Sequence, residues 1–302
     1  MARKTKKQGN VRQLLQLGGL RLGYRLGFAL APGRAAERAA RLFLSPPQQR
    51  PPKNLAQPQG EATRLVIEGP DMTTTGGPII AWSWGTGRTV LVVHGWEGEH
   101  RRMTPIIDRL TGAGFRVVAI DLPGHGASSG RLVPIPLLAR AVAAVGAKVG
   151  PLEAVVGHSL GGTATMLALT ELGMKARSAV IIASPNHPAH FARGVARLLG
   201  LDEAHFALMA QAIERLAGRP MDSLYLPPLL RQLDMPALFL HDPADEMVPI
   251  SHSHDNVAAW RGAKLKTLEG PGHRRILGDA EALQSILDFV RAESGRAETS
   301  TA

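Results

Sequence analysis

Ser159 stands in the stretch "VVGHSLGGTA", residues 155–164, between Gly157 and Gly161. A hydroxyl is a weak nucleophile until a base removes its proton and a third group orients that base. The apolar run before Ser159 predicts a strand, and the run after it predicts a helix that begins near Leu160. A strand that turns sharply into a helix presents its serine at a strained, exposed corner, where small neighbours permit close contacts. The stretch therefore predicts a nucleophile rather than an ordinary glycine-rich turn.

A histidine and an aspartate suited to the other two roles follow Ser159 in the chain. His273 lies in "KLKTLEGPGHRRIL", after the last predicted strand, where a loop can return an imidazole to the carboxyl edge of a parallel sheet. His158 adjoins Ser159, but at such a turn its side chain points away from the hydroxyl. The segment "HDPADEMVP" offers Asp242 and Asp245. Asp242 suits the capping of the turn that follows it, and we prefer Asp245 as the acid.

Two backbone N–H groups are candidates for holding negative charge on an acyl oxygen. The Leu160 N–H opens the predicted helix, where the helix dipole favours an anion. The second candidate comes from "TVLVVHGWEG", in which Gly95 and Trp96 directly follow a predicted strand. We assign this role to the Trp96 N–H; the alternative is that Trp96 is only an aromatic residue covering the core.

The composition narrows the remaining chemistry. The chain has 302 residues, of which 44% are hydrophobic and 20% are charged, as is typical of a globular protein with ample core. It contains no cysteine, which removes disulfides, thiolate metal ligands and a cysteine nucleophile. Residues 1–54 hold twelve Lys or Arg against one acid, Glu37, so their balance of +11 exceeds the net +10 and leaves −1 for the rest. We therefore expect no nucleic-acid partner. A serine activated by a histidine and an acid needs no metal or organic cofactor, and we expect neither.

Residues 1–54 are predicted to form a basic helical appendage that ends in the proline-rich linker "SPPQQRPP". Leucines recur every three or four residues with arginines between them, and a second helical stretch follows Pro32. Arg21 and Arg25 interrupt every apolar window long enough to span a bilayer, and a secretory signal is not expected. We expect a cytoplasmic protein. Two interpretations of the segment stay open: a basic amphipathic helix in peripheral contact with an anionic membrane, and a helix packed on the main domain or a solvated tail.

From Thr63 onward, eight short apolar runs alternate with helical patterns, which predicts a doubly wound α/β sheet. Unbroken apolar runs suit parallel strands that are buried on both faces. We place the main domain at residues 55–295 and a flexible tail at 296–302. Residues 186–232 show helical spacing alone, which predicts a helical cap over the carboxyl edge of the sheet; two ordinary crossover helices are the alternative.

Four segments together resemble the α/β-hydrolase fold superfamily: "VVHGWEG", "DLPGHGAS", "GHSLGG" and "HDPADEMVP…GPGH". The resemblance covers about residues 63–293 and implies a mostly parallel eight-stranded sheet flanked by helices, with a helical cap inserted after strand 6. It implies hydrolysis through an acyl-enzyme, with Ser159 as nucleophile, Asp245 as acid and His273 as base. The family's oxyanion amides fall on Trp96 and Leu160. Its loop after the fourth strand matches Asp121, Gly124, His125 and Gly126, which we interpret as architectural.

The predicted function is a serine hydrolase that cleaves carboxyl esters of small molecules. Thioesters and amides are within reach of the same groups, so a thioesterase or an aminopeptidase-like enzyme is an alternative. An aminopeptidase needs an acid aimed at the substrate amine, for which Glu97, Glu99 and Glu203 are candidates. An alternative of a different class is a non-catalytic binding module of the same fold, docked by its basic N-terminus.

Overall fold

The computed structural model describes residues 17–46, 55–68 and 77–300, with the backbone alone for residues 296–300. Residues 1–16 and residues 47–54, which include most of the predicted linker, lie outside this part of the chain. The chain divides into two compact units. One unit comprises Pro46–His187 and Tyr225–Ala302 and contains the sheet. The other comprises Met1–Ser45 and Pro188–Leu224, and its described residues form mainly helices.

The sheet has eight strands in the order β1-β2-β4-β3-β5-β6-β7-β8. β1 pairs with β2 and β2 with β4 in antiparallel fashion, and all other neighbours are parallel. This confirms the predicted α/β-hydrolase fold with a mostly parallel eight-stranded sheet, and each of the eight apolar runs is a strand. The strands are β1 (Thr63–Ile67), β2 (Ile79–Trp84), β3 (Thr89–Val93), β4 (Arg116–Asp121), β5 (Leu152–His158), β6 (Ala176–Ile182), β7 (Ala237–His241) and β8 (Ala263–Thr267).

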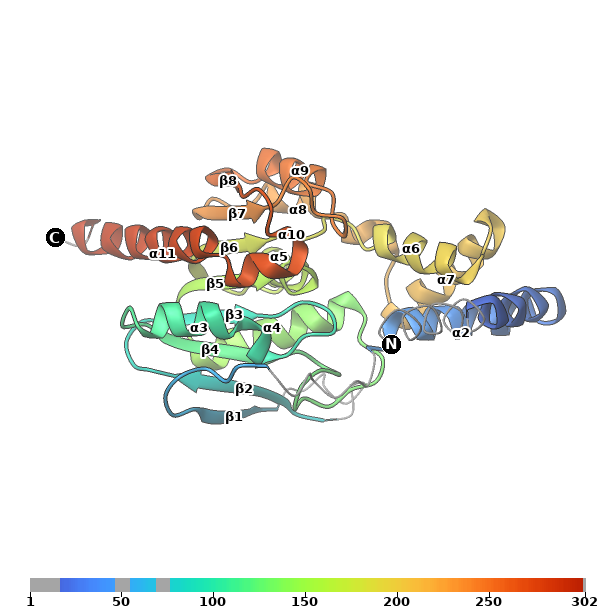
Figure 1. Cartoon of the computed structure of the whole chain (residues 1–302), viewed down its shortest axis with the longest axis horizontal. Coiled ribbons are helices and arrows are strands. Elements are labelled where there is room, and N and C mark those ends of the chain that lie inside the picture. The colour runs from blue at the N-terminus through green and yellow to red at the C-terminus, as the bar shows by residue number, and fades with distance from the viewer. Residues whose placement is uncertain (1–16, 47–54, 69–76, 301–302) are drawn as a thin grey trace, which may run out of the picture. The chain divides into compact units, whose positions relative to one another are not determined.

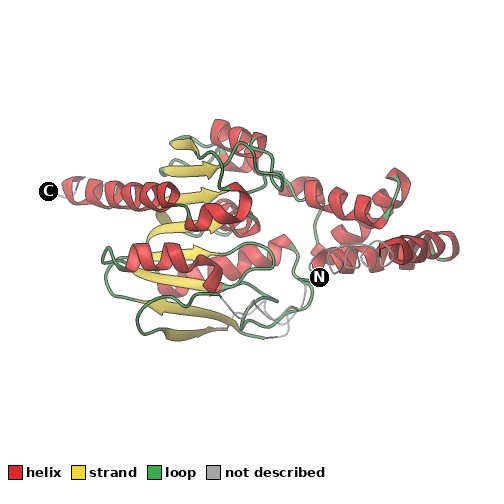
Figure 2. Ribbon diagram, viewed as in Figure 1, coloured by secondary structure: helices red, strands yellow, loops and turns green. Residues whose placement is uncertain are grey.

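Helices cover both faces of the sheet (Figures 1 and 2). α3 (Thr104–Thr111) and α11 (Ala280–Ser300) pack together on one face, and their apolar side chains form one buried cluster with alternate residues of β3, β4, β5 and β6. α4 (Ile135–Val149) packs against α5 (Leu160–Glu171) and lies on the other face. The unit also contains α8 (Leu226–Leu230), α9 (Ser251–Ala259), α10 (Gly272–Arg275), η2 (His100–Met103) and η4 (Ile276–Gly278).

The central strands are buried on both faces, as their continuous apolar sequences predict. Every residue of β3, β5 and β7 is buried. Val93 at the end of β3 is in register with Gly157 of β5, and His158 at the end of β5 is in register with Ile182 of β6. The carboxyl ends of these parallel strands therefore meet at one edge of the sheet, where their loops can bring side chains together.

The helical unit joins segments far apart in the sequence. It contains a helix over residues 17–30, then α2 (Pro32–Leu44), α6 (Ala189–Leu199), α7 (Glu203–Ala217) and η3 (Met221–Leu224). α2 packs against α7 and its alanines are buried. Arg21 Nε donates a hydrogen bond to the Leu198 carbonyl at 3.0 Å. Within the described residues, no helix combines the length and the apolar character needed to cross a membrane.

Three predicted boundaries differ from the structure. The described part of the N-terminal appendage shares a unit with residues 188–224. Of the segment 186–232, α6, α7 and η3 belong to the helical unit, whereas α8 belongs to the sheet unit. That this segment covers the carboxyl edge of the sheet stays a prediction. Finally, α11 runs to Ser300, beyond the domain end expected at residue 295.

Candidate active site

Ser159 occupies the sharp turn between β5 and α5. Its backbone has φ +51° and ψ −127°, a conformation that costs a side-chain-bearing residue on the order of 1–3 kcal/mol. The turn is held because the Ser159 N–H donates to the Ile182 carbonyl at 2.9 Å. A Cβ at Gly161 would lie 2.2 Å from the His94 carbonyl oxygen, and one at Gly157 would lie 2.7 Å from the Cα of Gly162. Glycine at both positions is thus a packing requirement of the turn.

A continuous chain of hydrogen bonds links Ser159 to an acid. His273 Nε2 lies 3.0 Å from Ser159 Oγ, and His273 Nδ1 lies 2.7 Å from Asp245 Oδ2. All three side chains are buried. Because a carboxylate only accepts, the proton of neutral His273 resides on Nδ1, and Nε2 is left to accept the Ser159 hydroxyl proton. His273 is positioned by α10, a single turn that follows β8.

Asp245 is oriented by the backbone of its own turn. Its Oδ1 accepts hydrogen bonds from the Met247 N–H at 2.8 Å and the Val248 N–H at 3.0 Å, which leaves Oδ2 to face His273. Burial alone would raise the pKa of the Asp245 carboxyl. The hydrogen bonds from His273 and from the two N–H groups outweigh burial and hold the pKa of Asp245 below its ordinary value. The carboxylate is therefore ionised at neutral pH.

Asp242, the other candidate acid, has a different set of contacts. Its Oδ1 accepts from the Ala244 N–H at 2.8 Å, as expected for a residue that caps its turn. Its Oδ2 accepts from the Gly272 N–H at 2.5 Å, on the residue just before His273. Asp242 thus ties the two loops together, while Asp245 contacts the imidazole itself.

The two candidate oxyanion donors lie at the ends of neighbouring strands. Leu160 is the first residue of α5, and Trp96 lies three residues after the end of β3. Neither N–H donates to a protein acceptor within the described residues, so both are open to a ligand. A Cβ at Gly95 would lie 2.9 Å from the Cβ of Ser159, so glycine is what allows the β3 loop to approach the serine.

His94 orients the loop after β3, a role that was not predicted from the sequence. Its Nε2 accepts from the Leu122 N–H at 3.0 Å, so its proton resides on Nδ1, which lies 2.7 Å from the Gly95 carbonyl oxygen. Burial lowers the pKa of His94, which keeps the ring neutral and its two bonds intact. The dipeptide His94-Gly95 directly after a strand is the only signal for it.

His158 holds the backbone of His273 in place. Its Nε2 donates to the backbone carbonyl of His273 at 2.9 Å, and the two rings lie 5.0 Å apart. Burial, with the charge of a protonated His273 as a smaller contribution, lowers the pKa of His158 to about 3. As expected, its side chain makes no hydrogen bond to the Ser159 hydroxyl.

The loop after β4 has the architectural contacts expected of it. Asp121 accepts from the His100 N–H at 2.9 Å, the Ala127 N–H at 3.0 Å and the Trp82 indole at 3.1 Å. Burial opposes ionisation of Asp121, but the hydrogen bond and charge of the His100 ring, with smaller contributions from His94 and the Ala127 N–H, lower its pKa to about 2. A Cβ at Gly126 would lie 2.3 Å from the Asp121 carboxyl carbon.

The candidate amine-binding acids are each engaged by an arginine. Glu97 lies 3.5 Å from Arg274, Glu203 lies 2.8 Å from Arg193, and Glu99 contacts Arg101. In the portions of the chain that the structure describes, no group of three or more His, Asp or Glu side chains is arranged to hold a metal ion.

The fold and the strand–serine–helix turn define an α/β hydrolase. Residues 90–284 match the alpha/beta hydrolase family, and the chain belongs to that family. It is 27% identical over 248 residues to a pimeloyl-[acyl-carrier protein] methyl ester esterase of Xanthomonas campestris pv. campestris, covering 69% of this chain and 97% of the relative. It is 26% identical to a non-heme haloperoxidase of Rhodococcus erythropolis, covering 74% of this chain and 100% of that one.

The solved structures agree on the fold. An esterase from Thermogutta terrifontis superposes with a TM-score of 0.56 at 19% identity, over 76% of this chain and 99% of the other. The family match and the esterase of Xanthomonas support hydrolase activity for this chain.

Proposed function

We propose that this protein is a serine hydrolase of carboxyl esters in which Ser159 is the nucleophile, His273 the general base and Asp245 the orienting acid. The observation that carries the proposal is the hydrogen-bond chain of 3.0 Å from Ser159 Oγ to His273 Nε2 and 2.7 Å from His273 Nδ1 to Asp245 Oδ2. Both distances are those of the base-activated nucleophile in its reactive arrangement.

The reaction begins when the Ser159 oxygen attacks the ester carbonyl carbon while His273 Nε2 takes the hydroxyl proton. The imidazolium that forms is stabilised by the ionised Asp245. The tetrahedral intermediate then expels the alcohol, which receives the proton from His273. Water, deprotonated by His273, attacks the acyl-enzyme, and the carboxylic acid leaves as Ser159 regains its proton.

The negative charge of each tetrahedral intermediate is assigned to the N–H groups of Trp96 and Leu160. Both lack protein acceptors within the described residues. The Leu160 N–H also lies at the N-terminus of α5, where the helix dipole favours negative charge. Loss of one such donor is expected to cost on the order of 10²–10³ in rate.

The ester is favoured over the other acyl substrates by two observations. The Xanthomonas relative is named a methyl ester esterase, which makes a carboxyl ester the first substrate class to test. For an aminopeptidase, the three candidate acids Glu97, Glu99 and Glu203 are already paired with arginines. A thioesterase uses the same groups and remains the alternative. A non-catalytic binding module would not need the hydrogen-bond chain at Ser159.

The test is covalent labelling of the full chain with a fluorophosphonate probe, which reacts with activated serines. We expect labelling of the wild type and of the exposed-serine control Ser251→Ala, and none of Ser159→Ala. Turnover of short-chain and long-chain p-nitrophenyl esters should fall by on the order of 10⁴–10⁶ in Ser159→Ala. Equal labelling of Ser159→Ala and wild type, or absence of labelling together with absence of turnover, would overturn the proposal.

A further inference from the structure

The helix of residues 17–30 has an apolar face that is open to solvent. Leu22, Leu26 and Leu30 follow at intervals of four residues and so share one side of the helix. Their exposed fractions are 57%, 53% and 84%, whereas Tyr24 and Phe28 on the opposite side are buried. A row of exposed leucines is uncommon on a surface that meets only water. It indicates that this face has an apolar partner.

No charged side chain interrupts this face. At about 100° per residue, the positions beside the leucines are Gly18, Gly19, Gly23 and Ala29. The two arginines of the helix, Arg21 and Arg25, fall together on its other flank, and Arg21 is bonded to the Leu198 carbonyl of α6. The face therefore combines protruding leucines with small residues that would not obstruct close approach.

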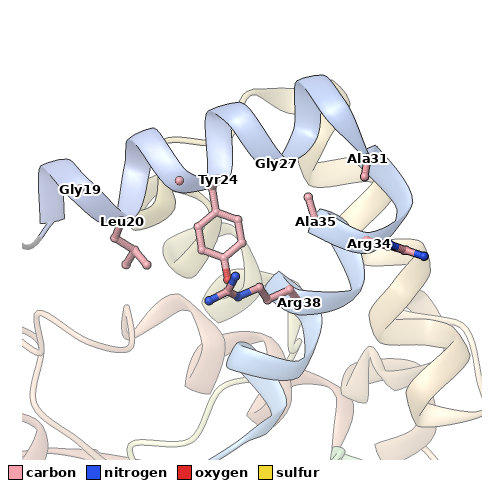
Figure 3. A pocket seen from close by; sticks show the side chains of 9 residues that line it. Gly19, Leu20, Tyr24, Gly27, Ala31, Arg34, Ala35 and Arg38 are labelled. Carbon is pink, nitrogen blue, oxygen red and sulfur yellow. The ribbon is translucent and has the colours of Figure 1, made fainter.

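Cationic side chains lie beside the apolar face, on α2. Arg34 and Arg38 line a groove of about 340 Å³ between the helix of residues 17–30 and α2. Figure 3 shows the Arg38 and Tyr24 side chains together in the angle between the two helices, whereas Arg34 points away from them. Burial raises the pKa of the Tyr24 hydroxyl against the opposing effect of Arg38, so the hydroxyl stays a hydrogen-bond donor at neutral pH.

The charge in this part of the chain is almost entirely of one sign. Glu37 is the single acid of residues 1–54, and it pairs with Arg41 at 2.8 Å. Within the described residues 17–46, four further arginines (Arg21, Arg25, Arg34 and Arg38) favour an anionic partner. The acidic side chains of a protein would bind the arginines but would not bury a row of leucines. An anionic lipid surface does both, because its phosphates bind arginines and its apolar interior buries leucines.

We propose that the helix of residues 17–30 and α2 form a peripheral docking surface for an anionic lipid bilayer. Leu22, Leu26 and Leu30 enter the boundary between headgroups and acyl chains, and Arg34 and Arg38 lie at the level of the phosphates. This proposal does not depend on the chemistry at Ser159.

The test is flotation of the full chain with two kinds of vesicle, phosphatidylcholine alone and phosphatidylcholine containing 30% phosphatidylglycerol. We expect the wild type to float with the anionic vesicles and to partition at least tenfold less into the neutral ones. Leu22→Gln/Leu26→Gln should reduce partitioning into anionic vesicles at least tenfold. The matched control is Val66→Gln/Leu172→Gln, which changes two residues of the sheet unit with exposed fractions of 47% and 42% and should bind like the wild type.

The arginines are tested in the same way. Arg34→Gln/Arg38→Gln should lose the preference for anionic vesicles by tenfold or more, since each cation near the surface contributes on the order of a fivefold effect. The control removes two exposed arginines of the sheet unit, Arg64→Gln/Arg291→Gln, and should leave partitioning unchanged. Thermal melting and p-nitrophenyl ester turnover in vesicle-free buffer, equal in all variants, establish that the variants are folded.

Two results would overturn the inference. One is wild-type partitioning of the leucine variant, since binding that needs only the arginines belongs to a purely electrostatic partner such as an acidic protein. The other is absence of flotation of the wild type at 0.1 M salt with either kind of vesicle.

Discussion

Asp245→Asn tests whether Asp245 is the acid, because the two carboxylate oxygens of Asp245 have different hydrogen-bond partners. Oδ1 accepts two backbone hydrogen bonds, from Met247 and Val248, and Oδ2 accepts one from His273 Nδ1. An asparagine in this place keeps its carbonyl oxygen at the Oδ1 position, because two N–H donors there need an acceptor. Its NH₂ group is thereby turned towards His273.

The consequence is a change of tautomer at the base. An NH₂ group donates to His273 Nδ1, so the imidazole proton moves to Nε2. A protonated Nε2 cannot accept the Ser159 proton, and the stabilising charge of the carboxylate is lost as well. We expect kcat/KM for p-nitrophenyl acetate to fall about 10⁴-fold, which corresponds to about 5 kcal/mol of transition-state stabilisation.

Asp242→Asn is the matched control, because it makes the same change in the same turn. Asp242 accepts one N–H from Ala244 and one from Gly272, so an asparagine retains at least one of these bonds. The lost hydrogen bond is worth about 1.5–3 kcal/mol. If all of that free energy acted on the position of His273, kcat/KM would fall ten- to hundredfold, and we expect no larger loss. Thermal melting of both variants separates catalysis from folding. A greater loss in Asp242→Asn, or retention of a tenth of the activity in Asp245→Asn, would refute the assignment.

Two further predictions concern stability. Gly161→Ala should lower the free energy of unfolding by about 3 kcal/mol, because its Cβ would lie 2.2 Å from a backbone carbonyl. Gly194→Ala in α6, with nothing within 4 Å of its Cβ, should be neutral or stabilising by about 0.5–1 kcal/mol in the same urea titration; equal effects would contradict the packing argument. Burial lowers the pKa of His158 to about 3 and that of His125 to about 4. Both histidines stay neutral in the folded protein, whereas in the unfolded chain they bind protons below the ordinary histidine pKa of about 6.5. The free energy of unfolding is therefore highest above pH 6.5. It falls by roughly 1.4 kcal/mol per histidine per pH unit towards pH 4. Urea midpoints measured from pH 7 to pH 4.5 should show this decline, and His125→Gln should make it shallower; a flat profile speaks against neutral buried histidines.

The sheet could be predicted because each strand carries its own signal. Runs such as "TVLVVHG" and "AVVGHS" are apolar on both faces, and only the interior of a parallel sheet buries both. The meeting of the site residues could also be predicted, because the segments that follow parallel strands lie at one edge of the sheet. Ser159 directly after β5 and His273 in the segment that follows β8 are accordingly brought within hydrogen-bond distance.

The organisation of the helical segments was harder to predict, because amphipathic helices do not specify their partners. Residues 17–44 show leucines and alanines at helical spacing, which is equally compatible with a separate appendage and with a packed helix pair. The structure places them in one unit with α6 and α7, in which α2 packs against α7 and its alanines are buried. Small residues permit such close packing but give no distinct sequence signal for it.

The orientation of the proposed oxyanion donor depends on a contact between neighbouring residues. The C=O and N–H groups of a trans peptide point in opposite directions within one plane. In the peptide between Gly95 and Trp96, the carbonyl accepts from His94 Nδ1 at 2.7 Å and from the Gly98 N–H at 3.1 Å. Turning this peptide over would therefore break two hydrogen bonds at once. His94 is itself fixed by the Leu122 N–H at the end of β4. The orientation of the Gly95–Trp96 peptide is thus fixed by contacts at the ends of two adjacent strands, and the proposed role of the Trp96 N–H requires such preorganisation.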